Sequence, residues 1–201
     1  MLGGGVGVIS SELEHSNYLI NLDSSFVDLK QCNQNYGEII NSINGSMTEL
    51  PFKEDFFDSI ICAHILAGAK ENDIKNNLVI KDTVNQYPTV EKTLKEIQRV
   101  LKNNGILFLT ASNNAYYKSS KLTYQELTVS LKRYFPKYTL SFYNTYPRFS
   151  KKYRKLNFAN IFPKFGSKMT SWENQISKLA KKDVGKKRNS VSFIVTAQKI
   201  K

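Results

Sequence analysis

Gly3-Gly4-Gly5-Val6-Gly7, close to the N-terminus of the 201-residue chain, is the stretch that decides the fold. It carries the pattern G-x-G-x-G at Gly3, Gly5 and Gly7. Glycines let the backbone turn sharply and let a ligand approach more closely than a Cβ atom would permit. A helix predicted over residues 8–14 would direct its N-terminal amides toward such a ligand. The stretch predicts a ligand-binding turn between a strand and a helix, and a tight turn without a ligand is the alternative.

Two familiar phosphate-binding patterns do not fit this loop. The dinucleotide pattern G-x-G-x-x-G fails because its last position falls on Val8 or on Ser10. A P-loop fails because the first lysine of the chain is Lys30. Glycine-rich turns also serve NAD, FAD and phosphate sites in other contexts, so the loop by itself leaves the ligand open.

Asp23 is the second candidate ligand-binding residue. It ends the next predicted strand, residues 18–22, and follows Gly7 by 16 residues. A carboxylate at that place can accept hydrogen bonds from both hydroxyls of a ribose. An aspartate at a strand end also commonly caps a helix, here one beginning near Ser24-Ser25. Next to the glycine loop, the ribose is the better interpretation.

Strand-like and helix-like patterns alternate through the first 150 residues, which predicts an α/β fold with a mostly parallel sheet. The predicted strands are residues 18–22, 37–43, 57–62, 106–110, 138–143 and 191–197. The later predicted helices are residues 89–101 and 123–134, and a turn is predicted at Asn103-Asn104-Gly105. In such a fold, ligands bind at the carboxyl ends of the strands.

Two long stretches, residues 67–87 and 148–189, interrupt this alternation and are expected to form lids or substrate-binding surfaces. The length of the chain suits a single domain. We expect residues 1–111 to form a cofactor-binding core and residues 112–189 an acceptor-side region with a basic insertion. Residues 190–201 would supply the last strand.

The formal net charge of +12 lies in the last quarter of the chain. Residues 151–201 hold 14 of the 29 lysines and arginines but 2 of the 17 acidic residues, so residues 1–150 carry no net charge. This distribution predicts an anionic partner, RNA or an anionic membrane surface, approached through residues 148–189. A solvated, solubilising surface is the alternative.

The two cysteines, Cys32 and Cys62, lie far from the spacing of a metal site, so we expect no metal and a reducing compartment. No apolar run approaches the ~20 residues of a membrane span, and the N-terminus lacks the pattern of a signal peptide. A cytoplasmic protein, at most peripheral to a membrane, is the simplest expectation. The sequence leaves the oligomeric state open.

Four motifs follow one another along residues 1–111. They are Gly3-x-Gly5-x-Gly7, Asn21-Leu22-Asp23-Ser24-Ser25, Gly45-Ser46-Met47-Thr48-Glu49-Leu50-Pro51-Phe52 followed by Phe57-Asp58-Ser59-Ile60-Ile61, and Glu96-Ile97-Gln98-Arg99-Val100-Leu101-Lys102-Asn103-Asn104-Gly105. In order and spacing this series resembles class I S-adenosylmethionine-dependent methyltransferases, and most closely the methyltransferase type 11 group. The resemblance implies a Rossmann-like methyltransferase fold, with helices on both faces of a mostly parallel central sheet.

The resemblance also implies that S-adenosyl-L-methionine is the cofactor and that seven residues bind it. They are Gly3, Gly5 and Gly7 beside the methionine and ribose portions, Asp23 at the ribose hydroxyls, Ser46 and Met47 beside the adenine, and Ala63 near the sulfonium.

His64 is the candidate catalytic residue. At the end of the third predicted strand its imidazole would lie near the reactive methyl group, where it could accept a proton from a hydroxyl nucleophile. A histidine that is only packed or hydrogen-bonded at the strand end is the alternative. A catalytic side chain is not required, because the cofactor already activates the methyl group and the protein supplies proximity and orientation.

Three features depart from the family pattern. Met1 stands where the family usually has an acid, and Ser46 stands where an acid commonly contacts the adenine amino group. The first strand, normally central, is reduced to Met1-Leu2, and a missing central strand exposes neighbouring backbone groups and apolar faces. We therefore expect an N-terminally truncated form, either a piece of a longer protein or a family member with weakened cofactor binding.

The expected function is methyl transfer to a small-molecule, lipid or sugar-like acceptor. An RNA-directed methyltransferase that uses the basic C-terminal region is the alternative enzyme, although the sequence holds no recognisable RNA-binding module. The non-enzymatic alternative is a catalytically inactive, methyltransferase-like binding subunit. Insertions carry acceptor specificity in this fold, so the core motifs do not identify the acceptor.

Overall fold

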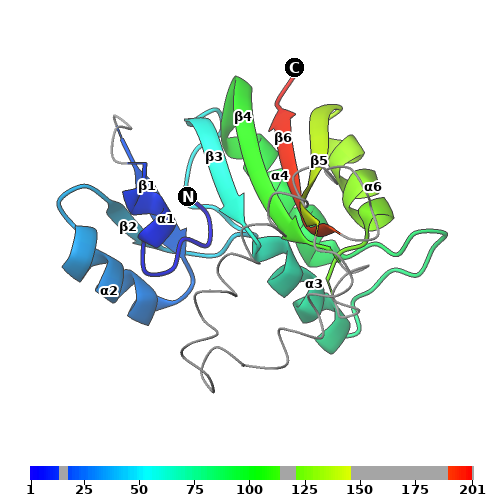
Figure 1. The fold of residues 1–201 in the computed structure, drawn as a ribbon, viewed down its shortest axis with the longest axis horizontal. Coiled ribbons are helices and arrows are strands. Elements are labelled where there is room, and N and C mark those ends of the chain that lie inside the picture. Colours follow the sequence, from blue (N-terminus) through cyan, green and yellow to red (C-terminus); the bar gives the residue numbers. More distant parts are fainter. Residues whose placement is uncertain (14–17, 114–120, 146–189, 201) are drawn as a thin grey trace, which may run out of the picture.

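The computed structural model describes residues 1–13, 18–113, 121–145 and 190–200, whose arrangement is shown in Figure 1. The helices are α1 Val8–Ser11, α2 Phe26–Tyr36, α3 Ile65–Lys75, α4 Pro88–Val100 and α6 Tyr124–Tyr134. The strands are β1 Ile20–Asp23, β2 Asn41–Asn44, β3 Phe57–Ala63, β4 Leu101–Ser112, β5 Lys137–Thr145 and β6 Ser190–Gln198. The basic stretch 148–189 lies outside the described residues.

One residue, Leu2, joins the strands into a continuous sheet. Strands β1 and β2 pair in parallel, and the other four strands run in the order β3-β4-β6-β5. Leu2 forms one parallel bridge to Leu22 of β1 and another to Cys62 of β3. Strand β6 runs antiparallel to both of its neighbours, while the other pairings are parallel. The prediction of a mostly parallel sheet is therefore confirmed.

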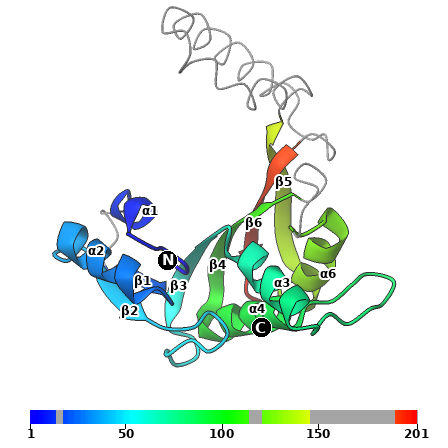
Figure 2. The same ribbon diagram turned by 90° about the horizontal axis from the view of Figure 1, so that it is seen from below.

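Helices lie on both faces of this sheet, as predicted. The bridges place Leu2, Leu22 and Cys62 on one face, where they belong to the main core with α3, α4 and α6. Figure 2 shows these three helices together on one side of the sheet. The neighbouring side chain of β1, Asn21, points to the other face, where it contacts Ser10 of α1 and the Cys32 thiol of α2.

Helix α4 shows how the sequence builds the main core. It begins at Pro88, whose fixed φ suits the first position of a helix and whose missing N–H would be unpaired there anyway. Val90, Leu94 and Ile97 recur at helical spacing and are buried, so they form one apolar stripe. This stripe packs with the buried face of β4.

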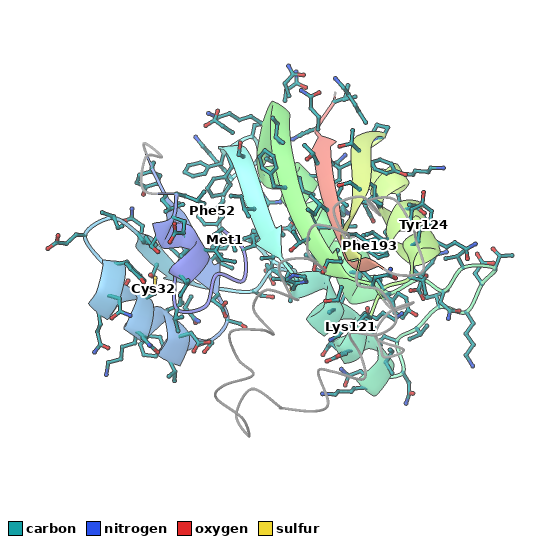
Figure 3. All side chains as sticks on the ribbon, in the orientation of Figure 1. Met1, Cys32, Phe52, Lys121, Tyr124 and Phe193 are labelled. Carbon is teal, nitrogen blue, oxygen red and sulfur yellow. The ribbon has the colours of Figure 1, made fainter. Side chains whose placement is uncertain are left out.

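The apolar residues form this main core and a second, smaller one; Phe193 of the first and Cys32 of the second are labelled in Figure 3. Phe193 of β6 is fully buried, and its ring lies edge-on to that of Tyr124, with the centroids 6.4 Å apart. Cys32 belongs instead to a separate cluster with Leu19 and Ile40, beside β1 and α2. The two ends of the sheet are therefore packed unequally.

A buried ion pair ties α3 to the start of α6. The Lys70 ammonium donates to both carboxylate oxygens of Glu126, at 3.1 and 2.9 Å, and the Tyr87 hydroxyl donates to the same carboxylate at 2.7 Å. Glu126 also completes the predicted capping box with Thr123. The Lys70 ammonium donates in addition to the Lys121 carbonyl oxygen, so every member of this group has partners.

Residues 67–87 were predicted to form a lid or a substrate-binding surface. This prediction is wrong for residues 67–75, because they belong to helix α3. Leu66 and Ala69 of this helix are buried in the main core, but so are the charged residues Lys70 and Asp73. Asp73 accepts hydrogen bonds from the Thr89 backbone N–H and hydroxyl. Because charged residues occupy part of the buried face of α3, the sequence lacks the regular spacing of apolar residues by which a helix is predicted.

The turn predicted at Asn103-Asn104-Gly105 is instead an irregularity inside β4. The register shifts there, since Phe57 pairs with Leu101 but Ser59 pairs with Ile106. Asn104 has the left-handed backbone conformation of a turn residue, with φ 65°. The Asn104 N–H nevertheless donates to the carbonyl oxygen of Lys199, the residue that follows β6. The irregular part of β4 therefore stays hydrogen-bonded to the neighbouring chain segment.

Two other predicted elements have different ends. The strand predicted over residues 37–43 begins at Asn41, because the N–H groups of Gly37 and Ile40 donate back to the end of α2. The helix predicted over residues 8–14 ends at Ser11 within the described residues. Neither change moves the glycine loop or Asp23 from the carboxyl edge of the sheet.

Candidate functional site

The glycine loop folds back onto the end of β1. Gly3, Gly5 and Gly7 have φ angles of 64°, 50° and 87°, in the left-handed region that favours glycine. The Gly5 N–H donates to the Asp23 carboxylate at 2.8 Å, and the Gly3 N–H donates to the Leu22 carbonyl oxygen at 2.8 Å. The structure therefore brings together the two features that the sequence analysis singled out.

The glycines of the loop are required for two different reasons. A Cβ atom at Gly3 would overlap the side chain of Ile65, one at Gly4 would overlap Asn21, and one at Gly7 would lie 2.5 Å from the Cys32 sulfur. A Cβ at Gly5 would meet nothing within 4 Å. Packing therefore excludes larger residues at Gly3, Gly4 and Gly7, whereas the space over Gly5 is open to a ligand.

The Asp23 carboxylate has room for further hydrogen bonds. Its Oδ2 accepts from the Gly5 N–H and its Oδ1 accepts from the Ser25 N–H at 2.9 Å, while the side chain is half-buried. A carboxylate offers about four lone-pair positions, so capacity remains for two donors such as ribose hydroxyls. With the open space over Gly5, these residues fit the ribose of S-adenosylmethionine. The alternative role for Asp23 was to cap helix α2. Ser25 caps this helix instead, because its hydroxyl accepts a hydrogen bond from the Asp28 N–H.

Asn21 is a site residue that the sequence analysis missed. It is completely buried, and its amide donates to the Gly5 carbonyl oxygen at 3.0 Å. Its side-chain oxygen accepts from the Ser10 hydroxyl at 3.2 Å. A polar residue in the middle of a short buried strand was the available signal, because a buried amide needs partners.

Ser46 and Met47 lie in a tight turn after β2, which reaches the Asp23 end of the sheet. The Ser46 hydroxyl accepts from the Thr48 N–H at 3.2 Å and contacts the Thr48 hydroxyl at 2.9 Å. Asn44, the last residue of β2, donates through its side chain to the Asp23 carbonyl oxygen at 3.1 Å. The turn is thus adjacent to Asp23, and its side chains hold the turn itself.

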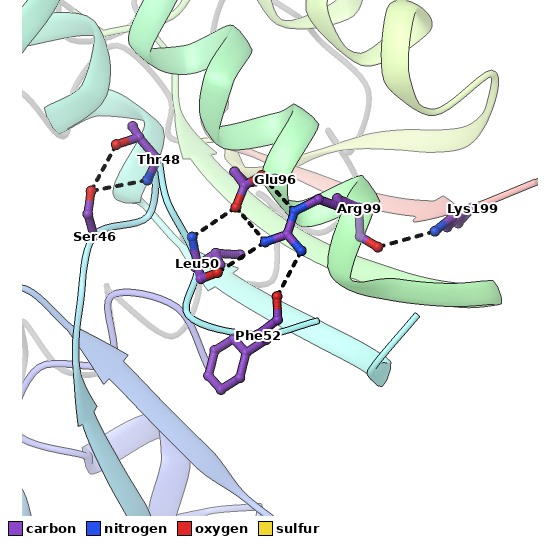
Figure 4. A network of polar contacts seen from close by, with 7 residues as sticks. All are labelled: Ser46, Thr48, Leu50, Phe52, Glu96, Arg99 and Lys199. Atoms are coloured by element: carbon purple, nitrogen blue, oxygen red, sulfur yellow. Dashed lines mark hydrogen bonds and ion pairs between the residues drawn. The ribbon is translucent and has the colours of Figure 1, made fainter. Parts of the chain in front are cut away.

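Glu96 and Arg99 fix the chain that follows this turn, as Figure 4 shows. The Leu50 N–H donates to Glu96 at 2.9 Å, and the Arg99 guanidinium donates to the carbonyl oxygens of Leu50 and Phe52 at 3.0 and 2.8 Å. Arg99 also pairs with Glu96 and thereby holds the pKa of that carboxyl below its ordinary value. The arginine of the Arg99-Val100-Leu101 motif therefore has a structural role, because with Glu96 it holds the backbone of Leu50 and Phe52 in place.

His64 follows Ala63 at the carboxyl end of β3. Its φ is 60°, a left-handed conformation that costs a non-glycine residue about 1 kcal/mol. Its Nδ1 lies 3.2 Å from the Ser112 hydroxyl at the end of β4, and the side chain is exposed. Burial of part of the ring, aided by the Lys121 charge, lowers the pKa of His64 and so favours the neutral imidazole.

The described residues contain no cluster of three or more His, Cys, Asp or Glu side chains suited to a metal. Burial raises the pKa of the Cys62 thiol to about 12, which keeps it protonated and unreactive. Within the same parts of the chain, no helix is long and apolar enough to cross a membrane.

Comparison with known proteins identifies the family. The family model described as a methyltransferase domain matches residues 1–109. No curated protein matches the sequence.

Solved structures share the fold at low sequence identity. An S-adenosylmethionine-dependent methyltransferase from Archaeoglobus fulgidus has a TM-score of 0.60 and 13% identity, over 98% of this chain and 84% of that chain. A possible histamine N-methyltransferase from Thermotoga maritima has a TM-score of 0.59 and 13% identity, over 98% and 79%. The N-methyltransferase NodS from Bradyrhizobium japonicum, solved with S-adenosyl-L-homocysteine, has a TM-score of 0.58 and 10% identity, over 100% and 76%.

The family match covers more than half of the chain and includes the glycine loop, Asp23, the turn after β2 and His64. The solved structures share the fold of this chain. The chain therefore belongs to the methyltransferase domain family, with S-adenosylmethionine as its cofactor.

Proposed function

We propose that this protein transfers a methyl group from S-adenosylmethionine to a small-molecule acceptor, with the glycine loop and Asp23 as the cofactor site. The single observation that carries the proposal is the hydrogen bond between the Gly5 N–H and Asp23, which closes the loop onto β1 beneath open space. Gly3 and Gly7 would shape the loop, and Asp23 would hold the ribose hydroxyls. Ser46, Met47 and Ala63 would border the adenine and the sulfonium.

The bound cofactor would supply an activated methyl group on a positively charged sulfur. The chain's own contribution is to orient that group and to accept the proton that a hydroxyl or amine nucleophile releases. His64 is suited to this role because its lowered pKa favours the neutral ring, which can accept a proton. Its Nε2 has a free lone pair in the tautomer whose Nδ1–H donates to the Ser112 hydroxyl.

The name of one neighbour in fold supports a small acceptor, and the name of another supports a nitrogen nucleophile. One carries the name of a possible histamine N-methyltransferase and another is the N-methyltransferase NodS. Small amines, followed by lipids and sugar-like compounds, are therefore the first acceptors to test. The basic region of residues 151–201, with 14 lysines and arginines, favours RNA as the second candidate acceptor.

Calorimetry with S-adenosylmethionine and S-adenosylhomocysteine tests the cofactor site. Asp23→Asn should weaken binding of both ligands by at least about tenfold, because charge-assisted hydrogen bonds to the ribose are lost. Asp58→Asn makes the same chemical change on an exposed side chain of β3 and should leave the affinity unchanged. A folded wild-type protein without detectable binding would favour the inactive binding subunit.

Transfer of a radiolabelled methyl group to a panel of small amines, lipids and sugars tests the reaction. His64→Asn tolerates the left-handed backbone but has no base at pH 7, so turnover should fall about 100-fold or more with little change in cofactor affinity. Turnover that is unchanged would remove His64 from the mechanism.

Binding of generic RNA across a salt series separates the two acceptor classes. A phosphate-driven interaction weakens steeply as salt rises. Methylation of RNA, with steep salt dependence and no transfer to any small acceptor, would replace the small-molecule proposal.

A further inference from the structure

We infer that Asn21 is the residue that positions the cofactor loop, by holding the carbonyl side of Gly5 while Asp23 holds its N–H. The inference rests on the proposed cofactor site and gives a role to Asn21, a residue of the second motif to which the family resemblance assigns none. Asn21 is a positioning residue, because it touches the loop and would act on the cofactor through it.

The contacts of Asn21 all converge on the loop and its supports. Its side-chain amide donates to the Gly5 carbonyl oxygen at 3.0 Å and lies 3.5 Å from the Cys32 sulfur. Its oxygen accepts from the Ser10 hydroxyl in α1. Asn21 has no exposed surface, so water cannot replace these partners if they are lost. One side chain of β1 thus links the loop, α1 and α2.

Gly5 is therefore tethered on both sides by neighbouring residues of β1. Asp23 accepts from its N–H at 2.8 Å and Asn21 donates to its carbonyl oxygen. When ribose hydroxyls donate to Asp23, they share the carboxylate with the Gly5 N–H. The bond from Asn21 does not involve the carboxylate, so it can keep the Gly5 peptide in place while Asp23 serves the ligand.

Asn21 also defines the space that the loop can occupy. A Cβ at Gly4 would overlap the Asn21 side-chain oxygen, although Gly4 is a variable position in the pattern G-x-G-x-G. Gly4 and Asn21 therefore act as a matched pair, in which the missing side chain of one accommodates the amide of the other.

Hydrogen exchange of the glycine loop and calorimetry, measured on the same variants, test this role. Asn21→Leu keeps the approximate volume but removes the donor, so amide exchange over residues 3–7 should rise about tenfold. The dissociation constants of S-adenosylmethionine and S-adenosylhomocysteine should rise by a similar factor, because both ligands share the loop.

Two controls separate positioning from general destabilisation. Thr93→Val removes a buried hydrogen bond inside α4, at 2.7 Å from the Thr89 carbonyl oxygen, and should lower stability without changing the loop or the affinity. Ser10→Ala removes the partner of the Asn21 oxygen but leaves the bond to Gly5, and should have a smaller effect than Asn21→Leu. If Asn21→Leu does not fold, Asn21→Ala gives the same comparison with less steric change.

A double-mutant cycle tests the matched pair. Gly4→Ala should weaken cofactor binding strongly in the wild type but have a smaller further effect in the Asn21→Gly background, where the overlap with the amide is gone and only Met1 Cγ, at 3.0 Å, stays close to the added methyl group. Equal effects in both backgrounds would overturn the pairing. Loop exchange in Asn21→Leu no faster than in Thr93→Val would overturn the positioning role.

The exchange measurement keeps this inference separate from the proposed function. If the wild-type protein binds no S-adenosylmethionine, the proposed function fails, but loop exchange still decides whether Asn21 holds Gly5.

Discussion

The part of the molecule around β1 and β2 and the part around β3, β4, β6 and β5 are stabilised in different ways. The second part contains most of the main core, including Leu94, Phe135 and Phe193, each with no exposed surface. The first part has a small separate cluster around Cys32, and it leaves Phe26 and Val27 71% and 75% exposed.

The glycine loop and Asp23 belong to the lightly packed part, where hydrogen bonds rather than apolar burial fix the geometry. Backbone and side-chain bonds from Asn21, Asp23 and Leu22 hold the loop, while most of the strand residues that pack with α3, α4 and α6 lie on β3, β4 and β6. The part around β3, β4, β6 and β5 therefore provides most of the stability, and the part around β1 and β2 sets the geometry of the candidate cofactor site. Substitutions in the well-packed part should change the free energy of unfolding, and those near the loop should change affinity.

The largest expected effect on stability comes from the ion pair between Lys70 and Glu126. Lys70→Met leaves the Glu126 carboxylate buried without its cation, which should lower the free energy of unfolding by about 3–5 kcal/mol at pH 7. Urea unfolding measures the change. Lys102→Met, which breaks an exposed pair with Asp58, should cost under about 1 kcal/mol. Similar costs for both variants would show that burial does not decide how much an ion pair contributes in this well-packed part.

Removal of an apolar side chain gives the next effect. Leu94→Ala opens a cavity beneath β4 and should cost about 2–5 kcal/mol. Leu19→Ala in the small cluster should cost less, because Leu19 is 9% exposed and its surroundings can relax more. Denaturant unfolding of the two variants measures both values. A larger loss for Leu19→Ala would show that the cofactor-side part carries the stability.

The pH dependence of unfolding sharpens the comparison further. Burial alone would raise the pKa of Glu126, but the Thr123 N–H, the Lys70 ammonium and the Tyr87 hydroxyl together hold the pKa below its ordinary value. The native state therefore binds the Glu126 proton less readily than the unfolded state does. This stabilisation is present above about pH 4.5 and is lost as the pH falls through the native-state pKa.

Glu126→Gln should make the loss of stability on acidification smaller. The measurement is the midpoint temperature of thermal unfolding as a function of pH, between pH 3 and pH 7. Glu38→Gln, an exposed substitution beyond the end of α2, is the matched control and should leave the curve unchanged. An unchanged loss of stability on acidification in Glu126→Gln would mean that other carboxylates dominate.

The smallest expected effect is stabilising. Gly68 lies in α3, and a Cβ there would meet nothing within 4 Å, so Gly68→Ala should raise the free energy of unfolding by about 0.5–1 kcal/mol. Cofactor affinity should not change. A thermal shift assay and calorimetry measure the two quantities, and a change in affinity would show that the two parts are coupled through α3.

Much of the fold was predictable because local signals agreed with the final structure. The apolar stripe of α4 and the Thr123–Glu126 capping box gave helices with nearly correct ends. The glycine loop and Asp23 were recognised from residue type and spacing, and they are in contact.

What the sequence did not predict depends on contacts between distant residues. Helix α3 was missed because Lys70 is buried against Glu126, 56 residues away in the chain. A turn was predicted at Asn104 because Asn and Gly are typical turn residues, and Asn104 does have a turn-like φ, but its pairing depends on Lys199. The role of Asn21 was hidden because a buried amide looks like an ordinary strand residue until its partners are known.

The bridge through Leu2 has a thermodynamic consequence. The loop that leaves Leu2 is also the loop that would receive the cofactor, so occupancy and continuity of the sheet are linked. A ligand at about 100 times its dissociation constant adds about 2.7 kcal/mol to the stability of the state that binds it. Because Leu2 and Leu22 belong to the main core, we expect S-adenosylmethionine to raise the midpoint of thermal unfolding of both ends of the sheet together, as a thermal shift assay measures.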